Sequence, residues 1–425
     1  MPARRDLKSW VLATSICVFS SANGQNSVLI EYRNASWWDG YSEVSGSRFV
    51  RDGRFVDSKG TAADVVIELN GAVATAPFGE GHNHNLIDVF FERSNREYLQ
   101  SGVFYVKVPG IHPPAVAPIK NALSRADTVD AAYALGSITS PGGHPVPLFV
   151  ETLAEPVYGG ATYEEFAGQA FHEVSSEADI SSSIRVLAGQ GTDFVKAILA
   201  YSEEFEDGFQ DGMNPALLPF LVGEAHAQNL EVTLHVDSAQ DFRTGVDAGV
   251  DEIAHLPGLV WSRARNAEQH RLTEDDAQRA ADAGIAVVAT THFQNVLAEI
   301  FSISAERVAE FKDVQRHNLD LLINAGVEIR IGSDVYDRLG NGMGAKPTRG
   351  EIESLVALGV YDNASALSRW IDTGRKIFPN RKIGCFKPGC EASFLVFEAD
   401  PRKDILNLDR IRLAVKQGID VTQDQ

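Results

Sequence analysis

The sequence predicts an α/β protein built on a (β/α)8 TIM-like barrel, with a small β-sandwich that both chain ends form together. The middle of the chain alternates short apolar runs with helical patterns, the order expected of strand–helix–strand units around a parallel sheet. The two ends instead show short β-rich runs separated by turn residues. With 425 residues, 44% of them hydrophobic, the chain can bury one large core or two domains.

Four segments are expected along the chain. They are a signal peptide at 1–24, a first part of the sandwich at 25–75, a metal-dependent barrel at 76–382 and a second part of the sandwich at 383–425.

The N-terminal segment has the layout of a secretory signal peptide. Arg4, Arg5 and Lys8 form a basic start, and an apolar run from Trp10 to Phe19 precedes small residues such as Ala22. This run is too short for a permanent transmembrane helix, and no later segment is long and apolar enough for one. We therefore expect an exported protein, periplasmic or extracellular, without stable membrane insertion; the alternative for this segment is a disordered tail.

The β-rich ends are expected to pack together, because neither has enough strands to bury a core of its own. The N-terminal runs are "SVLIEYRNASWWDG", "GSRFVRDGRFVDSKG" and "ADVVIELNGAVATAP", and the C-terminal ones are "ASFLVFEADP" and "IRLAVKQGID". Cys385 and Cys390 flank "FKPG" in the C-terminal part. An even number of cysteines in an exported protein permits a disulfide across this tight turn, and the alternative is two free thiols.

The middle of the chain supplies eight strand candidates. Helical patterns at 215–228, 273–284 and 304–326 precede three of them. The first candidate leads into His82, and the others lie at 103–110, 147–153, 192–199, 231–236, 251–255, 284–291 and 326–334. Eight such units predict a barrel, whose active site lies at the C-terminal ends of the strands.

Metal-ligand residue types stand at several of these strand ends. In the His-Asn-His stretch, residues i and i+2 of an extended strand point to the same side, so two imidazoles are aimed at one point. Alternation in "DFVKAIL" puts Lys196 on one face, and a charged, unpaired lysine inside a barrel is costly unless CO2 converts it into an anionic carbamate; the alternative is a lysine that reaches solvent. The candidate ligands are His82, His84, Lys196, His235, His255 and Asp334.

With these residues the sequence resembles the metal-dependent amidohydrolase superfamily, in the branch that holds imidazolonepropionase-like enzymes and Xaa-Pro or Xaa-Arg dipeptidases. The stretches that carry the resemblance are "GHNH", "GTDFVK", "TLHV", "GVDEIAHLPG", "IGSD" and "KIGCFKPGCEASFLVFEADP". It implies that His82 and His84 bind a buried metal, that His235 and His255 bind a second, and that a carbamate on Lys196 bridges them. Asp334 would bind the first metal and carry the catalytic proton.

The sequence departs from the family pattern in details outside these ligands. Glu80 stands where the family has an aspartate before its His-x-His, and Ala392-Ser393 replaces the usual Ala-Asp of the closing pattern. Alternation back from Asp334 also puts Arg330 inside the barrel. We expect either a bulge that breaks the alternation or a carboxylate partner for Arg330 at the far end of the barrel.

The ligand set predicts an enzyme that hydrolyses an amide C–N bond in a small substrate such as a dipeptide, an N-acyl amino acid or a cyclic amide. One or two divalent ions, by default zinc, would activate the attacking water, and Asp334 would move its proton to the leaving nitrogen. The same centre could open a lactone or cleave a phosphotriester, and a non-catalytic binding protein is a further alternative. A formal net charge of −20 argues against nucleic acid as a partner; a homo-oligomer is possible.

Other residues near the strand ends are weaker candidates. Tyr201 is a candidate to stabilise an oxyanion, with a packing role as the alternative, and His292 is a candidate to face the substrate. Tyr336 and Arg338 could bind a substrate carboxylate. The remaining histidines have no partner pattern: we expect a structural role for His226, and surface or loop positions for His112, His144, His172, His270 and His317.

Overall fold

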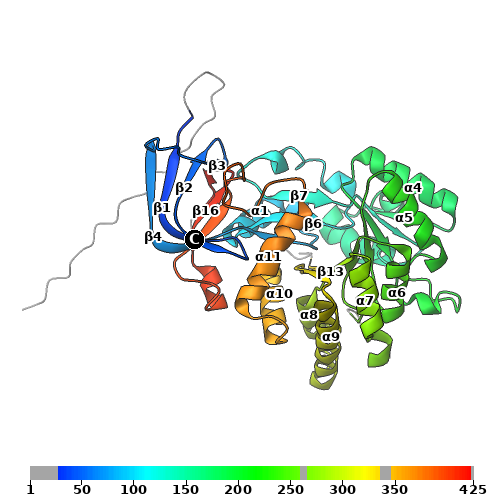
Figure 1. The fold of residues 1–425 in the computed structure, drawn as a ribbon. Coiled ribbons are helices and arrows are strands. Elements are labelled where there is room, and N and C mark those ends of the chain that lie inside the picture. Colours follow the sequence, from blue (N-terminus) through cyan, green and yellow to red (C-terminus); the bar gives the residue numbers. More distant parts are fainter. Residues whose placement is uncertain (1–26, 259–265, 336–345, 423–425) are drawn as a thin grey trace, which may run out of the picture.

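Strands from both chain ends pair in a single sheet. The computed structural model describes residues 27–258, 266–335 and 346–422, so the expected signal peptide lies outside the described residues. β4 and β15 join the two ends in antiparallel register, with Leu395 opposite Thr75. Figure 1 shows the N-terminal strands and the C-terminal strands together at one end of the molecule. In spatial order the strands are β17 (Ile419–Asp420), β16 (Ile411–Lys416), β15 (Phe394–Phe397), β4 (Val65–Thr75), β1 (Ile30–Trp38), β2 (Glu43–Arg51) and β3 (Arg54–Val56).

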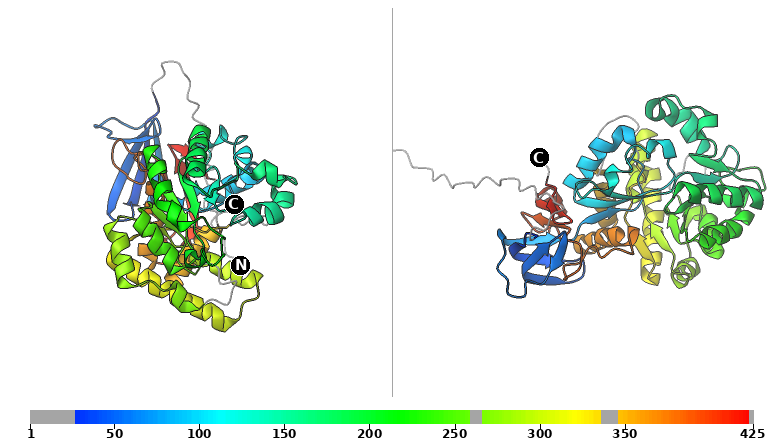
Figure 2. Two further views of the ribbon diagram at one scale, coloured as in Figure 1. Left: turned by 90° about the vertical axis from the view of Figure 1, so that its right-hand side faces the viewer. Right: turned by 90° about the horizontal axis from the view of Figure 1, so that it is seen from above.

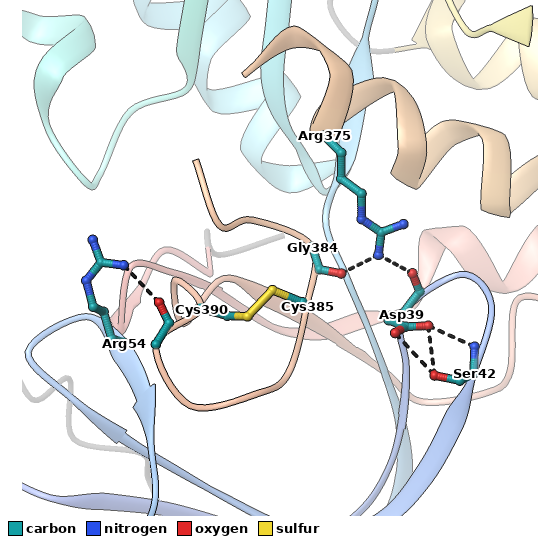
Figure 3. The surroundings of a disulfide bond; sticks show 8 residues. Asp39, Ser42, Arg54, Arg375, Gly384, Cys385 and Cys390 are labelled. Carbon is teal, nitrogen blue, oxygen red and sulfur yellow. Dashed lines mark hydrogen bonds between the residues drawn. A yellow bond between two sulfur atoms is a disulfide. The ribbon is translucent and has the colours of Figure 1, made fainter. Parts of the chain in front are cut away.

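The pairing of the two ends confirms that they form one β-rich unit, while its description as a two-layer sandwich stays a prediction. A disulfide joins Cys385 to Cys390, so the first of the two alternatives for these cysteines holds. Figure 3 shows how the chain around the disulfide is held: Arg54 donates a hydrogen bond of 3.0 Å to the Gly389 carbonyl, and Arg375 donates to the carbonyls of Gly384 and Asp39.

A seven-stranded parallel sheet forms the centre of the molecule. Two of its inner strands are buried at every residue, including the polar residues Lys196, Thr233 and His235. In spatial order the strands of this sheet are β14 (Glu328–Arg330), β13 (Ala286–Val288), β12 (Glu252–Ala254), β11 (Val232–His235), β10 (Val195–Ile198), β8 (Ser137–Thr139) and β9 (Phe171–Glu173).

A separate three-stranded parallel sheet is hydrogen-bonded to this larger sheet at two places. It consists of β5 (Phe78–Glu80), β6 (Val103–Val108) and β7 (Asp130–Tyr133). Just after β5, the Gly81 amide donates a hydrogen bond of 2.7 Å to the carbonyl of Ile331, the residue after β14. Just before β10, the Asp193 amide donates a hydrogen bond of 2.8 Å to the carbonyl of Tyr133, the last residue of β7. Among the described residues no strand pairing joins the two sheets into one continuous ladder, so the closed eight-stranded barrel stays a prediction.

Helices cover the outside of the parallel strands, as the two views of Figure 2 show. No described helix is both long and apolar enough to span a bilayer. The helices are α1 (Phe91–Gln100), α2 (Ala154–Tyr158), α3 (Tyr163–Phe166), α4 (Glu177–Gln190), α5 (Leu218–Ala227), α6 (Ala239–Ala248), α7 (Glu274–Asp282), α8 (Thr291–Ile300), α9 (Ala305–Ala325), α10 (Lys346–Ala357) and α11 (Asn363–Ile377).

The structure differs most from the expected strands between residues 95 and 190. The run at 147–153 is not a strand but η4, a π-helical segment spanning Leu148–Leu153. Leu148, Phe149 and Leu153 all line one cavity, a spacing that a strand with side chains alternating between its faces would not give. The sequence predicts none of β7, β8 and β9, because runs of three or four residues carry too little periodic pattern.

Charged side chains from β6, β12 and β14 form a network of ion pairs. Arg330 Nη1 lies 2.5 Å from Oε2 of Glu252, and Lys107 Nζ lies 2.6 Å from Oε1 of the same carboxylate. Burial alone would raise the pKa of Glu252, but the two cations hold it at about 2. Arg330 therefore does have a carboxylate partner, the second of the two expected solutions.

Candidate metal centre

The six predicted ligands come together in one cavity of about 330 Å³. They reach it from five strands that are separated in sequence, in most cases from the C-terminal end of the strand or the residues that follow it. This is the placement that parallel strands with right-handed crossovers give to residues following each strand. The residues are His82 and His84 after β5, Lys196 in β10, His235 at the end of β11, His255 after β12 and Asp334 after β14.

Asp334 lies between three of the histidines. Its Oδ1 is 3.2 Å from His82 Nε2 and 3.4 Å from His84 Nε2, and its Oδ2 is 3.7 Å from His255 Nε2. Burial alone would raise the pKa of Asp334, but His255 and His82 bring it well below the ordinary value. The carboxylate is therefore anionic at neutral pH.

The other histidines complete a compact group. The ring of His255 is centred 4.7 Å from that of His82 and 4.8 Å from that of His235. The Thr290 hydroxyl lies 2.9 Å from His255 Nδ1, which leaves Nε2 of that ring toward Asp334. Burial lowers the pKa of His82 to about 3 and that of His235 to about 4, so both rings are neutral and able to coordinate a cation at neutral pH.

Lys196 is buried at the base of the group, with 3% of its surface exposed. Its Nζ has no hydrogen-bond partner among the described residues. Burial lowers its pKa to about 7, against the attraction of Asp334 and Glu252. An amine that is partly neutral and unpartnered fits the predicted reaction with CO2, because only the neutral amine is nucleophilic.

These donors fit a divalent cation. One ligand atom each from His82, His255 and Asp334 lie within 4.8 Å of one another. Neutral imidazoles and an anionic carboxylate are the donor set that zinc and similar ions take in proteins. The unpartnered Lys196 Nζ adds a position that a carbamate could complete.

Glu80 anchors the loops that carry two of these ligands. Its Oε1 accepts hydrogen bonds from the amides of His82 and Ser333, both at 2.9 Å, and the Thr348 hydroxyl donates to its Oε2. Glu80 is fully buried, and burial raises its pKa to about 7 against these hydrogen bonds. It stands where the resembled family has an aspartate, and it ties the end of β5 to the residue before Asp334.

The two weaker catalytic candidates do not line the cavity. The Tyr201 hydroxyl lies 3.1 Å from Nε2 of His270, whose Nδ1 faces the Asn266 carbonyl at 2.9 Å. His292 packs its ring against Gly350, and its amide donates to Glu351 (2.6 Å). Tyr201 and His292 are therefore packed beside the site rather than facing it; Tyr336 and Arg338 lie outside the described residues.

The histidines expected on the surface are largely inside the protein. His144 lines the cavity, with its ring centred 5.2 Å from that of His235, and His112, His172 and His270 are buried. His144 follows β8 and a Gly-Gly pair, and the three residues of β8 carry too little pattern to indicate this position. His226 pairs with Asp251 (2.9 Å), and His317 approaches the Leu272 carbonyl at 3.0 Å.

Solved structures share this architecture. An amidohydrolase matches with a TM-score of 0.71 at 18% identity, over 93% of this chain and 99% of that chain. A Xaa-Pro dipeptidase with methionine bound in its active site matches with a TM-score of 0.71 at 16% identity, over 92% and 99%. An ochratoxinase from A. niger matches with a TM-score of 0.71 at 16% identity, over 93% and 95%. No family model and no curated protein matches the sequence.

The fold of this chain is therefore the one that these solved structures share. At these identities the likeness establishes the fold, which confirms the resemblance seen in the sequence at that level. The chemistry of this chain has to be argued from its own residues.

Proposed function

We propose that this protein is a metal-dependent amidohydrolase that cleaves an amide C–N bond of a small molecule. The observation that carries the proposal is the convergence of His82, His84, His235, His255, Asp334 and Lys196 on one cavity. The backbone hydrogen bonds between the two parallel sheets, from Gly81 to Ile331 and from Asp193 to Tyr133, support a (β/α)8 barrel around this site. The fold shared with solved amidohydrolases supports the same reading.

The chain's own residues account for binding and proton transfer. One or two divalent ions bound by the histidines, Asp334 and the carbamate of Lys196, zinc by preference, would polarise the amide carbonyl and acidify the attacking water. Asp334 then accepts the proton of the water and delivers it to the leaving nitrogen, first as base and then as acid. The oxygen of water joins the acyl carbon as the C–N bond breaks, giving a carboxylic acid and an amine.

Lys196→Ala tests the proposal directly. We expect the variant to lose part of its bound metal and most of its activity on amide substrates, because the bridging anion is gone. Short carboxylic acids such as acetate should restore some activity by occupying the same space. Metal analysis by mass spectrometry and a panel of amide, lactone and phosphotriester substrates are the measurements.

Lys312→Ala, on the exposed side of α9, is the matched control and should behave as wild type. Full metal content together with full activity in Lys196→Ala would show that the ligand set is wrong. Turnover of lactones or phosphotriesters without turnover of amides would reassign the reaction on the same centre.

A further inference from the structure

The cavity that holds the candidate metal centre is polar at one end only. Apart from the six clustered residues and His144, the described lining has two side chains able to hydrogen-bond, those of Ser137 and Tyr158. All other described lining residues are aliphatic, aromatic, proline or glycine. Among the described side chains, a substrate therefore meets hydrogen-bonding groups mainly at its reacting amide and few beyond it.

Two helical segments build the apolar part. From one side, η4 contributes Leu148, Phe149 and Leu153, the last two buried. From another, α8 and the residue after it contribute Phe293, Leu297 and Phe301. Phe301 lines the cavity although 63% of its surface is exposed, which places it at the opening.

The charges of the lining belong to the reacting end. Lys196 and Asp334 are the only described lining residues of the charged types, and both are part of the candidate metal centre. A free carboxylate or ammonium group on the distal part of a substrate would therefore have no counter-ion among the described walls. Removing such a charge from water without a partner is strongly unfavourable.

We propose that the substrate is an uncharged amide that carries a bulky apolar group, aromatic or aliphatic, beyond the scissile bond. This inference rests on the proposed amide hydrolysis and narrows its substrate class: zwitterionic dipeptides are disfavoured against neutral acyl amides. The cavity volume of about 330 Å³ lies at the lower end of the range for small-molecule sites. The apolar group is therefore of limited size, and water is the only co-reactant.

A matched set of chromogenic amides tests the charge preference. The metal-loaded protein is given 4-nitroanilides of hexanoic acid, of 6-aminohexanoic acid and of adipic acid, which share the acyl length and differ in a methyl, ammonium or carboxylate end. We expect kcat/KM for the hexanoyl compound to exceed both others at least tenfold. Across the 4-nitroanilides of acetic, butanoic and hexanoic acid, kcat/KM should rise about three- to fourfold for each added methylene until the cavity is full.

The outcomes separate this inference from the proposed function. Equal or better turnover of a charged anilide, or cleavage of free dipeptides such as Leu-Pro but not of the hexanoyl anilide, would overturn the apolar preference and leave amide hydrolysis standing. If the metal-loaded protein cleaves no amide at all, both the apolar preference and the proposed amide hydrolysis are refuted.

Substitutions on α8 test whether this wall sets the preference. Leu297→Glu should lower kcat/KM for the hexanoyl anilide at least tenfold and improve the relative turnover of the aminohexanoyl compound. Phe301→Glu, at the exposed opening of the cavity, should also raise kcat/KM for the aminohexanoyl compound relative to the hexanoyl compound. Because Phe301 is exposed, this substitution should not destabilise the fold. Ile300→Glu is the matched control, since Ile300 is 55% exposed on the same helix and does not line the cavity. An unchanged ratio in both cavity variants, with circular dichroism and metal content as in wild type, would refute the assignment.

Discussion

Asp334 is held in a backbone conformation that few residues tolerate. Its φ of 54° lies in the left-handed region, and its amide donates to the His82 carbonyl at 2.7 Å. Aspartate is one of the residue types that adopt this conformation more readily, and such outliers gather at functional sites. The turn directs the carboxylate to His82, His84 and His255 at once.

Asp334→Asn should keep this shape while removing the proton acceptor. We expect kcat to fall by about 10²–10⁴, because an amide cannot take up the proton at neutral pH, with a much smaller change in KM. Steady-state kinetics combined with metal analysis checks this, and Asp282→Asn at the exposed end of α7 is the control. If kcat stays within about threefold with metal bound, less than 1 kcal/mol of barrier is involved and another group carries the proton.

Glu80 is expected to act by positioning, through its hydrogen bonds to the His82 and Ser333 amides. Glu80→Ala should weaken metal binding about 10–100-fold, the usual effect of losing a group that orients ligands. Glu80→Gln keeps an oxygen for both amides, and the Thr348 hydroxyl can turn to accept from its NH2 group, so most of the affinity should return. Metal titration by calorimetry distinguishes the two variants; equal affinities in Glu80→Ala and wild type would argue against this role.

At the scale of elements, the disulfide closes the turn that leads from α11 into β15. Cross-linking a loop of this length contributes about 2 kcal/mol to stability, by restricting the unfolded chain. The double variant Cys385→Ser, Cys390→Ser should lose about that much unfolding free energy in urea titrations, with unchanged kcat because neither residue lines the cavity. Reductant should lower the unfolding free energy of the wild-type protein by the same amount and leave that of the variant unchanged. An unchanged unfolding free energy of the wild-type protein in reductant would contradict the prediction.

At the scale of the whole molecule, buried carboxyls should make stability depend on pH. Glu351 in α10 accepts hydrogen bonds from the Thr291 hydroxyl (3.0 Å) and the His292 amide, while its Oε1 has no hydrogen-bond partner among the described residues. Burial raises its pKa from 4.5 to about 7. Since the folded chain then holds a proton that the unfolded chain has lost, stability should fall as pH rises from about 4.5 to about 7.

The size of this effect is on the order of 3 kcal/mol for one carboxyl. Urea unfolding of metal-free protein at pH 5 and pH 8 measures it, and Glu351→Gln should remove a corresponding part of the difference. Glu353→Gln, on the exposed side of the same helix, should leave the difference intact. A pH dependence identical in wild type and Glu351→Gln would show that this carboxyl does not titrate on unfolding.

The sequence by itself determined the α/β class, most of the parallel strands and the group of six residues at their ends. The physical reason is that alternation along a strand and the position of a residue after it are local properties, and parallel strands bring such ends to one edge. The pairing of both chain ends also followed from strand count, because too few strands cannot bury a core alone. The position of Glu80 before His82 marked it as a residue of interest, but its hydrogen-bond partners could not be predicted from the sequence.

Only the tertiary structure decided which other residues reach the site. His144 enters the cavity from a segment without periodic pattern, while Tyr201 and His292, which follow strands as the ligands do, are held by His270 and Glu351 instead. The run at 147–153 became a π-helical wall rather than a strand, since apolar residues alone do not choose between the two. Contacts between segments far apart in the sequence settled these points, and no local pattern records them.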